Sequence, residues 1–311
     1  MEFFKKKTSI RFMAHRKWWY AISGAMVLVS LLLLLTRGLN FGIDFTGGVV
    51  FEVAFPQAAD LDKVRGALAE KGYDEAVVQS FGTPRDVLVR LLPEEGKDVN
   101  VVGREVLAAL QGYDANAELR RTEVVGAQVG EELAGQGALA ALFAFLMILI
   151  YIGFRFQWKL GVGSIVAALH DPFIILGVFA ATQWTFDLPT LASVLAVVGY
   201  SLNDTIVVFD RIRERFILTR KGTPDEIVDL AINETLSRTL MTSVTTLIAV
   251  LSLLFIAGDV LKGFSVALAI GVLVGTYSSI YIASSIAVDL KLTARDLLPV
   301  QREKDAVDDM P

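Results

Sequence analysis

The chain has 311 residues, of which 54% are hydrophobic, and its formal net charge at pH 7 is −5. Soluble globular chains contain about 45–50% apolar residues, so this composition is typical of a membrane protein, and the negative charge argues against nucleic acid as a partner. The chain has no cysteine, which excludes disulfides and thiolate chemistry. Its two histidines, His15 and His170, are far apart, so we expect no metal site and no cofactor.

Six stretches are long and apolar enough to cross a bilayer, which takes about 20 apolar residues in a helix. They are residues 18–36, 137–154, 160–186, 188–209, 239–258 and 263–288. The first follows a basic tail, as the apolar part of a signal peptide does, but it is too long and no cleavage site of small residues follows it. We interpret it as an uncleaved anchor with Trp18, Trp19 and Tyr20 at the membrane interface.

The distribution of Lys and Arg predicts the orientation of these spans. Six precede the first span, two lie between the second and third, six between the fourth and fifth, and four follow the sixth, whereas the short connections on the opposite side hold only Lys262. Basic residues favour the cytoplasmic side, so both termini are expected there. The expected division is a tail 1–17, the first span 18–36, an outside domain 37–136, the remaining spans 137–288 with a cytoplasmic loop 210–238, and a tail 289–311.

The hydrophobic period of the inserted segment 37–136 predicts an α+β domain. Strands are expected at 49–55, 76–81, 86–92 and 118–125, and helices at 60–71 and 99–111. This order is that of the ferredoxin-like fold. With 17 acidic and 10 basic residues the domain is well solvated, and it has no phosphate-binding loop. We interpret it as a docking or spacing module, with a surface that holds an extended substrate as the alternative.

One carboxylate in the fourth span calls for a functional explanation. A charge in the middle of a bilayer costs about 2.5–3.5 kcal/mol on insertion scales, and Asp204 lies in that span with Ser201 one turn before it on the same helix face. A nearby cation lowers the proton affinity of a buried carboxylate, and the affinity rises again when the cation moves away. We predict a proton-binding role for Asp204; a buried carboxylate that only bonds to a neighbouring helix is the alternative.

The fifth span begins with Arg238, followed by Thr242 and Thr245 at positions that share one helix face. If the fourth and fifth spans are neighbours, this polar stripe can face Asp204. The alternative is an arginine that extends to the lipid headgroups, which is common at span ends.

The third span contains His170 and Asp171, followed by Pro172. Proline removes a backbone donor and frees the carbonyl of Ala168. Adjacent residues point about 100° apart on a helix, so we expect that His170 and Asp171 cannot face one partner. Asp171 either lines a polar pathway or stabilises the break at the proline, and the sequence leaves both open.

Two further segments are explained by structure alone. The sixth span carries Gly271 and Gly275 with the serine pairs 278–279 and 284–285, which predicts close helix packing. In the cytoplasmic loop, residues 223–226 form a capping box with proline at the first helical position. It is expected to start a short amphipathic helix on the membrane surface, with Ile227, Leu230 and Ala231 on one face.

Two motifs resemble the SecD/SecF family of protein-export membrane proteins. They are FGIDFTGG at residues 41–48 and GYSLNDTIVVFDRIRE at residues 199–214. Their spacing, the six spans and the outside domain extend the resemblance over nearly the whole chain. The residues that it marks as structural are Gly42, Asp44, Gly47, Gly48, Gly199 and Ser201. The glycines of the first motif permit backbone angles that side chains forbid.

The resemblance implies a place in the resistance–nodulation–division superfamily, as one six-span half of a pseudo-symmetric transporter. Such a protein uses the proton gradient to assist translocation of unfolded preproteins across the bacterial inner membrane. SecD would be the other half, with the SecYEG channel as an associated partner and YajC as a further one. The implied proton pathway in this half is Asp204, Arg238 and Thr242, with Asp171 as an additional candidate.

Three other functions are weighed against this one. A small-molecule exporter of the same superfamily typically carries two six-span halves and two outside domains, whereas this chain has one of each. An intramembrane enzyme is not expected, because the sequence has no Gly-x-Ser-x-Gly motif, no protease-like aspartate pair and no metal cluster. A structural scaffold leaves the cost of Asp204 unexplained.

Overall fold

The protein is described by a computed structural model that covers residues 8–92, 97–219, 222–256 and 261–297. Within these ranges six helical segments are long and apolar enough to cross a membrane, as expected. They are α1 (Arg16–Thr36), α5 (Ala127–Arg155), α6 (Trp158–Thr182), α7 (Leu188–Leu218), α8 (Pro224–Ile256) and a last segment made of α9 (Lys262–Tyr277), the π-helical η3 (Ser278–Ala283) and α10 (Ser284–Asp289). The expected tail residues 1–7 and 298–311 and the last two residues of the expected fifth span, 257–258, lie outside the described ranges.

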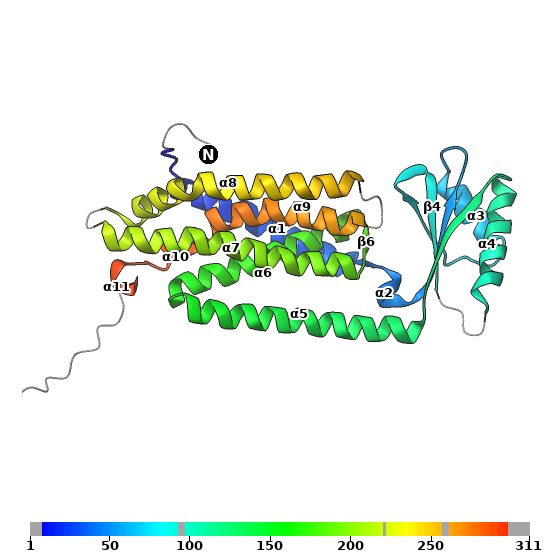
Figure 1. The fold of residues 1–311 in the computed structure, drawn as a ribbon, viewed down its shortest axis with the longest axis horizontal. Helices are drawn as coiled ribbons and strands as arrows, with labels where there is room; N and C mark the ends of the chain where they lie inside the picture. The colour runs from blue at the N-terminus through cyan, green and yellow to red at the C-terminus, as the bar shows by residue number, and fades with distance from the viewer. Residues whose placement is uncertain (1–7, 93–96, 220–221, 257–260, 298–311) are drawn as a thin grey trace, which may run out of the picture.

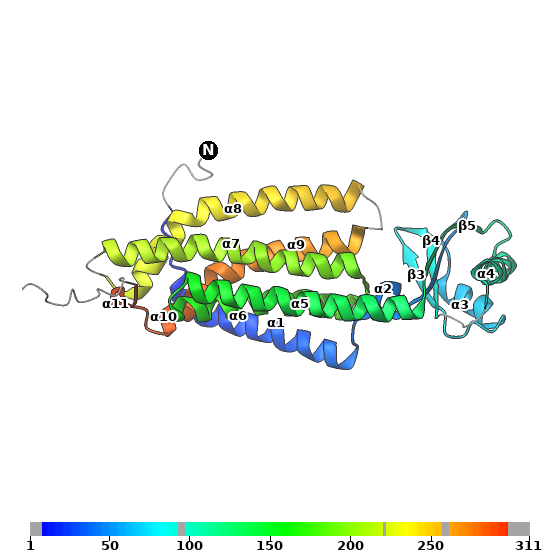
Figure 2. The ribbon, with the colours of Figure 1, turned by 60° about the horizontal axis from the view of Figure 1, so that its bottom comes forward.

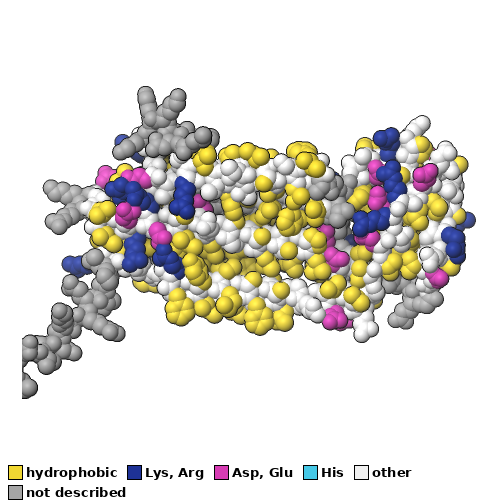
Figure 3. All heavy atoms as spheres, in the orientation of Figure 1, with side chains coloured by type: hydrophobic (Ala, Val, Ile, Leu, Met, Phe, Trp, Pro, Cys, Tyr) yellow, Lys and Arg dark blue, Asp and Glu magenta, His cyan; other side chains and the backbone are white. Residues whose placement is uncertain are grey.

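The six segments form an elongated bundle with the α+β domain at one end (Figure 1). Hydrophobic side chains cover the middle of the bundle, whereas charged side chains gather at its far end and on the α+β domain (Figure 3). Large apolar side chains such as Phe154 and Leu35 are almost fully exposed on this surface. A surface of this kind is stable in lipid and not in water, so the chain is a multi-pass membrane protein.

Three boundaries differ from the sequence-based expectation. Helix α5 begins at Ala127 and so includes residues that were expected in the outside domain. The helix extends past the apolar region because the polar side chains of Glu131, Glu132 and Gln136 remain exposed there. Helix α7 continues to Leu218, which shortens the expected loop 210–238 to the residues before α8. Helix α6 ends at Thr182, and the following residues form the short strand β6 (Thr185–Phe186).

The expectation of a separate amphipathic surface helix in that loop is wrong. Its capping box is present, since Thr223 and Glu226 exchange hydrogen bonds, but the helix that starts there continues as α8 to Ile256 (Figure 2). Ile227 and Ala231 are buried in the bundle core, whereas Leu230 is exposed. Tertiary packing therefore turns this segment into the first turns of the fifth span.

The α+β domain contains a four-stranded antiparallel sheet with two helices on one face. Its strands, in the order β3-β4-β2-β5 across the sheet, are β2 (Gly48–Ala54), β3 (Val77–Phe81), β4 (Thr83–Leu91) and β5 (Glu118–Val125). Its helices are α3 (Leu61–Ala69) and α4 (Val99–Tyr113). Phe51 and Val53 of β2 are fully buried in the core beneath the helices, whereas Val50 and Glu52 point to the other face. That helix-free face is turned toward the bundle (Figure 1).

A short connection joins the domain to the bundle. It contains β1 (Asn40–Phe41), which pairs in parallel with β6, and the single-turn α2 (Ile43–Thr46). The Asp44 carboxylate accepts a hydrogen bond from the Leu188 backbone N–H over 3.0 Å, at the first residue of α7. A carboxylate at a helix N-terminus satisfies a free N–H and complements the helix dipole. The connection therefore holds the outer end of α7 directly.

Two glycines of this connection are required by geometry. Gly47 and Gly48 have φ of +67° and +126°, which L side chains rarely adopt. A Cβ on Gly47 would lie 2.7 Å from the Ala127 Cα, and one on Gly48 would lie 2.5 Å from the Leu91 carbonyl oxygen. The pair therefore brings α5 and β4 against the connection.

Helix α9 packs closely on α7, as its glycine spacing predicts. A Cβ on Gly271 would lie 2.1 Å from Val197, and one on Gly275 would lie 2.9 Å from the Ser201 Cβ. Both serine pairs of the sixth span are fully buried. This contact brings polar side chains of the two helices within hydrogen-bonding distance.

Candidate functional site

The first part of the site is Asp204, in the middle of α7. Its side chain is 6% exposed, and its Oδ1 accepts a hydrogen bond of 2.7 Å from the Thr239 hydroxyl of α8. Its Oδ2 is buried and has no hydrogen-bond partner among the described residues. A buried carboxylate oxygen without a donor is costly, so Asp204 has one open position for a proton or a cation.

The polar stripe predicted on α8 does not face Asp204 in the structure. Arg238, Thr242 and Thr245 are exposed on the bundle surface, and Asp204 is not ion-paired with Arg238 within the described ranges. The Thr242 hydroxyl donates to the carbonyls of Arg238 and Thr239 in its own helix. The hydroxyl that reaches Asp204 is that of Thr239, which the sequence reasoning missed because its phase on α8 depends on how the helices pack.

Replacing Thr239 with valine is expected to destabilise the protein by about 1–3 kcal/mol, because the isosteric side chain leaves both Asp204 oxygens without a donor. Replacing Thr242 with valine is expected to change stability by less than about 0.5 kcal/mol, since that hydroxyl bonds only within its helix and is exposed. Thermal unfolding of the two purified variants in detergent measures the difference. Equal unfolding temperatures would contradict the Thr239–Asp204 contact.

The second part of the site is Asp171, in the middle of α6. Its side chain is fully buried, and its Oδ2 accepts hydrogen bonds from the hydroxyls of Ser201, over 2.5 Å, and Ser278, over 3.1 Å. Its Oδ1 lies 2.9 Å from His170 Nδ1. Three donors from α6, α7 and η3 therefore converge on one carboxylate, and the helix continues through Pro172 without a break.

Two expectations about these residues are wrong. His170 and Asp171 bond to each other, and both reach the sixth span: His170 Nε2 lies 2.8 Å from the Tyr277 hydroxyl while Asp171 contacts Ser278. Rotation about the side-chain bonds compensates for the 100° between adjacent Cβ directions. Ser201, expected beside Asp204, donates to Asp171 instead.

The segment opposite Asp171 and Asp204 is the π-helical η3. Its Ser279 hydroxyl lies 2.8 Å from the Thr205 hydroxyl and donates to the Ser201 carbonyl over 3.2 Å. Single π-helical turns inside α-helices are frequent at functional sites. Here η3 places hydroxyls beside α6 and α7 at the level of the two carboxylates.

Not every predicted motif residue belongs to this cluster. Gly42, Asp44, Gly47 and Gly48 lie in the connection at the outer end of the bundle. Gly199 is exposed on α7, and a Cβ there would meet nothing within 4 Å. Within the described residues no group of three or more metal-ligating side chains occurs.

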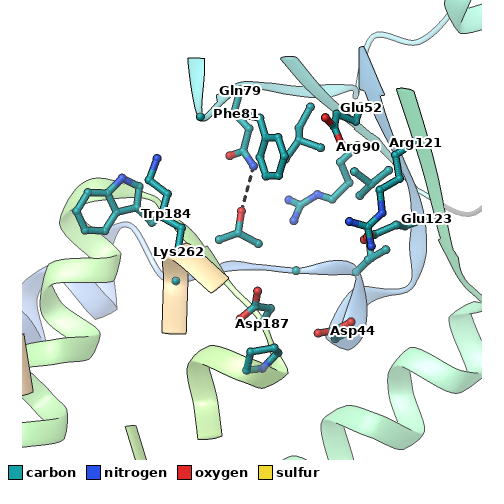
Figure 4. Close-up of a pocket in the computed structure, with 18 of the residues that line it drawn as sticks. Asp44, Glu52, Gln79, Phe81, Arg90, Arg121, Glu123, Trp184, Asp187 and Lys262 are labelled. Carbon is teal, nitrogen blue, oxygen red and sulfur yellow. Dashed lines mark hydrogen bonds and ion pairs between the residues drawn. The ribbon is translucent and has the colours of Figure 1, made fainter. Parts of the chain in front are cut away.

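A cavity of about 360 Å³ separates the α+β domain from the outer end of the bundle (Figure 4). Glu52, Phe81 and Arg90 line it from the sheet, and Trp184 and Asp187 line it from the connection between α6 and α7. It contains side chains of both charge signs and two aromatic rings, so it offers contacts to apolar and polar groups alike.

Few direct bonds cross this cavity. Gln79 donates to the Thr185 hydroxyl over 3.0 Å, and Arg90 donates to the Phe41 carbonyl and to Asn40 Oδ1. Burial lowers the pKa of Arg90, which lies outside the spans. Gln79 therefore bonds across the cavity to β6, whereas Arg90 bonds the sheet to β1 in the connection.

The fold and site define a class: a six-span membrane protein with an inserted α+β domain and two buried carboxylates between its central spans. The family profile described as "Protein export membrane protein SecD/SecF, C-terminal" matches residues 105–293, and the "SecD/SecF GG Motif" matches residues 32–59. The chain belongs to the SecF branch of the SecD/SecF family, which confirms the resemblance seen in its motifs.

Relatives named protein translocase subunit SecF match almost end to end. The one from Pseudomonas aeruginosa is 52% identical over 305 residues, which cover 97% of this chain and 98% of that protein. The one from Vibrio alginolyticus is 46% identical and covers 99% and 98%. The one from Escherichia coli O157:H7 is 43% identical and covers 96% and 93%.

Two solved structures have the same fold over most of the chain. The crystal structure of SecDF from Thermus thermophilus, a translocon-associated membrane protein, matches with a TM-score of 0.83 at 38% identity, over 91% of this chain and 39% of that one. SecDF in its super-membrane-facing form matches with a TM-score of 0.69 at 38% identity, over 93% and 39%. The chain thus spans well under half the length of these SecDF proteins.

Proposed function

We propose that this protein is the six-span half of a proton-driven auxiliary subunit of the preprotein translocase, working with SecD in a bacterial inner membrane. Both termini are cytoplasmic and the ferredoxin-like domain lies in the periplasm. The observation that carries the proposal is Asp204, a carboxylate buried between two spans with one oxygen that lacks a donor.

The proposed mechanism is a change in the protonation of Asp204. The open Oδ2 accepts a proton in one state, and in the other state the carboxylate is stabilised by a cation. Arg238 belongs to the helix whose Thr239 already bonds to Asp204, so a shift of α8 against α7 brings its guanidinium closer. Moving one charge across 100 mV supplies about 2.3 kcal/mol, enough to bias two helix arrangements.

SecD is proposed to cover the exposed face of α7 and α8. Gly199, Asn203, Arg238, Thr242 and Thr245 are exposed there in the middle or at the end of spans. Polar groups that face lipid tails are unfavourable, and small and hydroxylated residues allow close packing of another helix. The name SecDF of the two matching structures and their greater length support association with a second half, and the exposed polar residues support its placement on this face.

The outside domain is proposed to receive the motion of α7. Asp44 caps the first residue of α7, and the Gly42 N–H donates to the Phe186 carbonyl over 2.9 Å just before that helix. A displacement of α7 that follows protonation of Asp204 therefore acts directly on the connection to the sheet. The SecYEG channel, YajC and an unfolded preprotein are the further proposed partners.

The protein is proposed not to be an enzyme and to need no cofactor, with the proton as its coupling ion. A small-molecule exporter half is the alternative function. Complementation of a drug-sensitive strain distinguishes this alternative from protein secretion.

The proposal is tested in membrane vesicles that contain SecYEG and SecD with or without this chain. Preprotein translocation is measured with an imposed proton gradient and after its collapse by a protonophore. We expect the gradient to raise the rate only when the chain and SecD are both present. Stimulation that persists without the chain, or that is insensitive to the protonophore, contradicts the proposal. Copurification of SecD with the chain from native membranes is the accompanying control.

A further inference from the structure

A second titratable group is buried beside Asp171. His170 is 6% exposed and lies in the middle of α6. Both ring nitrogens have partners, because Nδ1 lies 2.9 Å from Asp171 Oδ1 and Nε2 lies 2.8 Å from the Tyr277 hydroxyl. Polar groups inside a membrane are costly and usually mark an ion or proton path.

The contacts of His170 continue as a series of hydrogen bonds from α1 to α7. The Tyr277 hydroxyl of α9 lies 2.6 Å from the Ser23 hydroxyl, which is buried on α1. On the other side of the imidazole, Asp171 accepts the Ser201 hydroxyl of α7. Four helices thus contribute to one continuous series in which every neighbouring pair is at hydrogen-bonding distance.

Both ends of the series lie close to other ionisable groups. Tyr20, one turn before Ser23 on the same face of α1, donates to the exposed carboxylate of Asp289 over 2.9 Å. At the other end Ser201 lies one turn before Asp204 on α7. The series therefore begins one helix turn from Tyr20, which contacts Asp289, and ends on the helix that carries Asp204.

From Ser23 to Asp171, the donors and acceptors can all be directed one way. Ser23 donates to Tyr277, Tyr277 donates to Nε2, and the Nδ1–H donates to Asp171. When Asp171 takes the Nδ1 proton, Nε2 takes the proton of Tyr277, Tyr277 takes that of Ser23, and Ser23 takes one from a hydronium ion at the α1 end of the series, which leaves water. Each group gives up one proton and receives one, so the net result is one proton added to Asp171.

The groups that face His170 are few. Asp171 lies on its own helix, Tyr277 packs edge-on against the imidazole from α9, and the Tyr277 ring lies beside Trp19 of α1. Among the described residues, Asp171 is the acidic side chain within hydrogen-bonding distance of the imidazole.

We propose that His170, with Tyr277 and Ser23, forms a proton relay that delivers protons to Asp171. This inference rests on the proposed proton coupling and adds to it a route and three residues outside the Asp204–Arg238 pair. His170 is a proton carrier in this relay, while Ser23 positions the Tyr277 hydroxyl and passes a proton to it.

The relay can be tested spectroscopically without any transport. The chain has two histidines, so the full-length His15→Gln protein labelled with ¹⁵N-histidine in lipid bilayers gives NMR signals from His170 alone. We expect the ¹⁵N signals of a protonated Nδ1 and of an Nε2 that accepts a hydrogen bond, and we expect the Nε2 signal to change in Tyr277→Phe and the Nδ1 signal to change in Asp171→Asn. The matched control is Tyr151→Phe, whose phenol is exposed on α5. Nδ1 and Nε2 signals that are unchanged in both variants overturn the relay.

A functional experiment distinguishes failure of the relay from failure of the proposed function. In the vesicle assay, Tyr277→Phe and His170→Gln are expected to reduce gradient-dependent stimulation about tenfold, whereas Tyr151→Phe leaves it unchanged. A wild-type chain without any gradient dependence overturns the proposed function, and the NMR result then still decides whether His170 is hydrogen-bonded to Tyr277 and Asp171. If the proton gradient stimulates translocation equally with the wild-type chain and with Tyr277→Phe and His170→Gln, the relay is overturned but the proposed function is not.

Discussion

Replacing Asp204 with asparagine is expected to leave the protein inserted and folded but to abolish the proton-dependent stimulation of secretion. Asparagine has nearly the same shape, and its carbonyl oxygen can still accept the Thr239 hydroxyl. It cannot take up or release a proton, so the two states of the α7–α8 contact no longer differ in charge. Because the variant removes a buried charge without adding volume, stability should be unchanged or slightly higher.

The measurement is preprotein translocation in vesicles with and without a proton gradient, together with the amount of protein in the membrane. Asp210→Asn is the matched control, since Asp210 lies on the same helix but is exposed and pairs with Arg155 at the surface. It is expected to keep its gradient dependence. If Asp204→Asn retained the stimulation, Asp204 would not be the coupling group.

Replacing Gly48 with alanine is expected to have the largest effect on folding of any single methyl addition in the connection. The new Cβ would be 2.5 Å from the Leu91 carbonyl oxygen, and the φ of +126° is strained for alanine. Strain alone costs about 1–3 kcal/mol, and a clash with backbone cannot be relieved by rotating a side chain. We expect a loss above about 3 kcal/mol and little folded protein in the membrane.

Gly72→Ala separates the two causes, because Gly72 has a φ of +87° but nothing within 4 Å of its Cβ position. It should lose only about 1 kcal/mol. Gly112→Ala, in helix α4 with open space around it, should be neutral or slightly stabilising. Membrane abundance and thermal unfolding of the three variants rank their stabilities. A Gly48→Ala protein as stable as Gly72→Ala would show that the backbone of the connection shifts to accommodate the added methyl group.

Much of the architecture is determined by the sequence alone. Runs of about 20 apolar residues have no stable place outside a bilayer, so the six spans can be counted directly. The alternating and helical periods of residues 49–125 likewise predict strands and helices close to those in the structure, because one face of each element must be buried. The ends of helices were less predictable, since α5, α7 and α8 extend beyond their apolar regions wherever polar turns remain hydrated or packed.

The site shows the same division. The cost of a carboxylate in lipid identified Asp204 and Asp171 as the side chains that require partners, whatever the arrangement of helices. Which hydroxyls meet them was decided by helix rotation and by close packing of α7 and α9 at Gly271 and Gly275. Thr242 and Thr239 are about 60° apart around the helix, so a modest rotation of α8 decides which of them faces Asp204, and no pattern on a single helix specifies it.

The six spans and two costly carboxylates were thus determined by residue type alone, because the transfer energy of a side chain depends little on its neighbours. The partners of Asp204, the link between His170 and Tyr277, and the cap of Asp44 on α7 were decided only by tertiary structure. Each of these contacts joins residues far apart in the sequence, and hydrogen bonds require positions accurate to a fraction of an ångström.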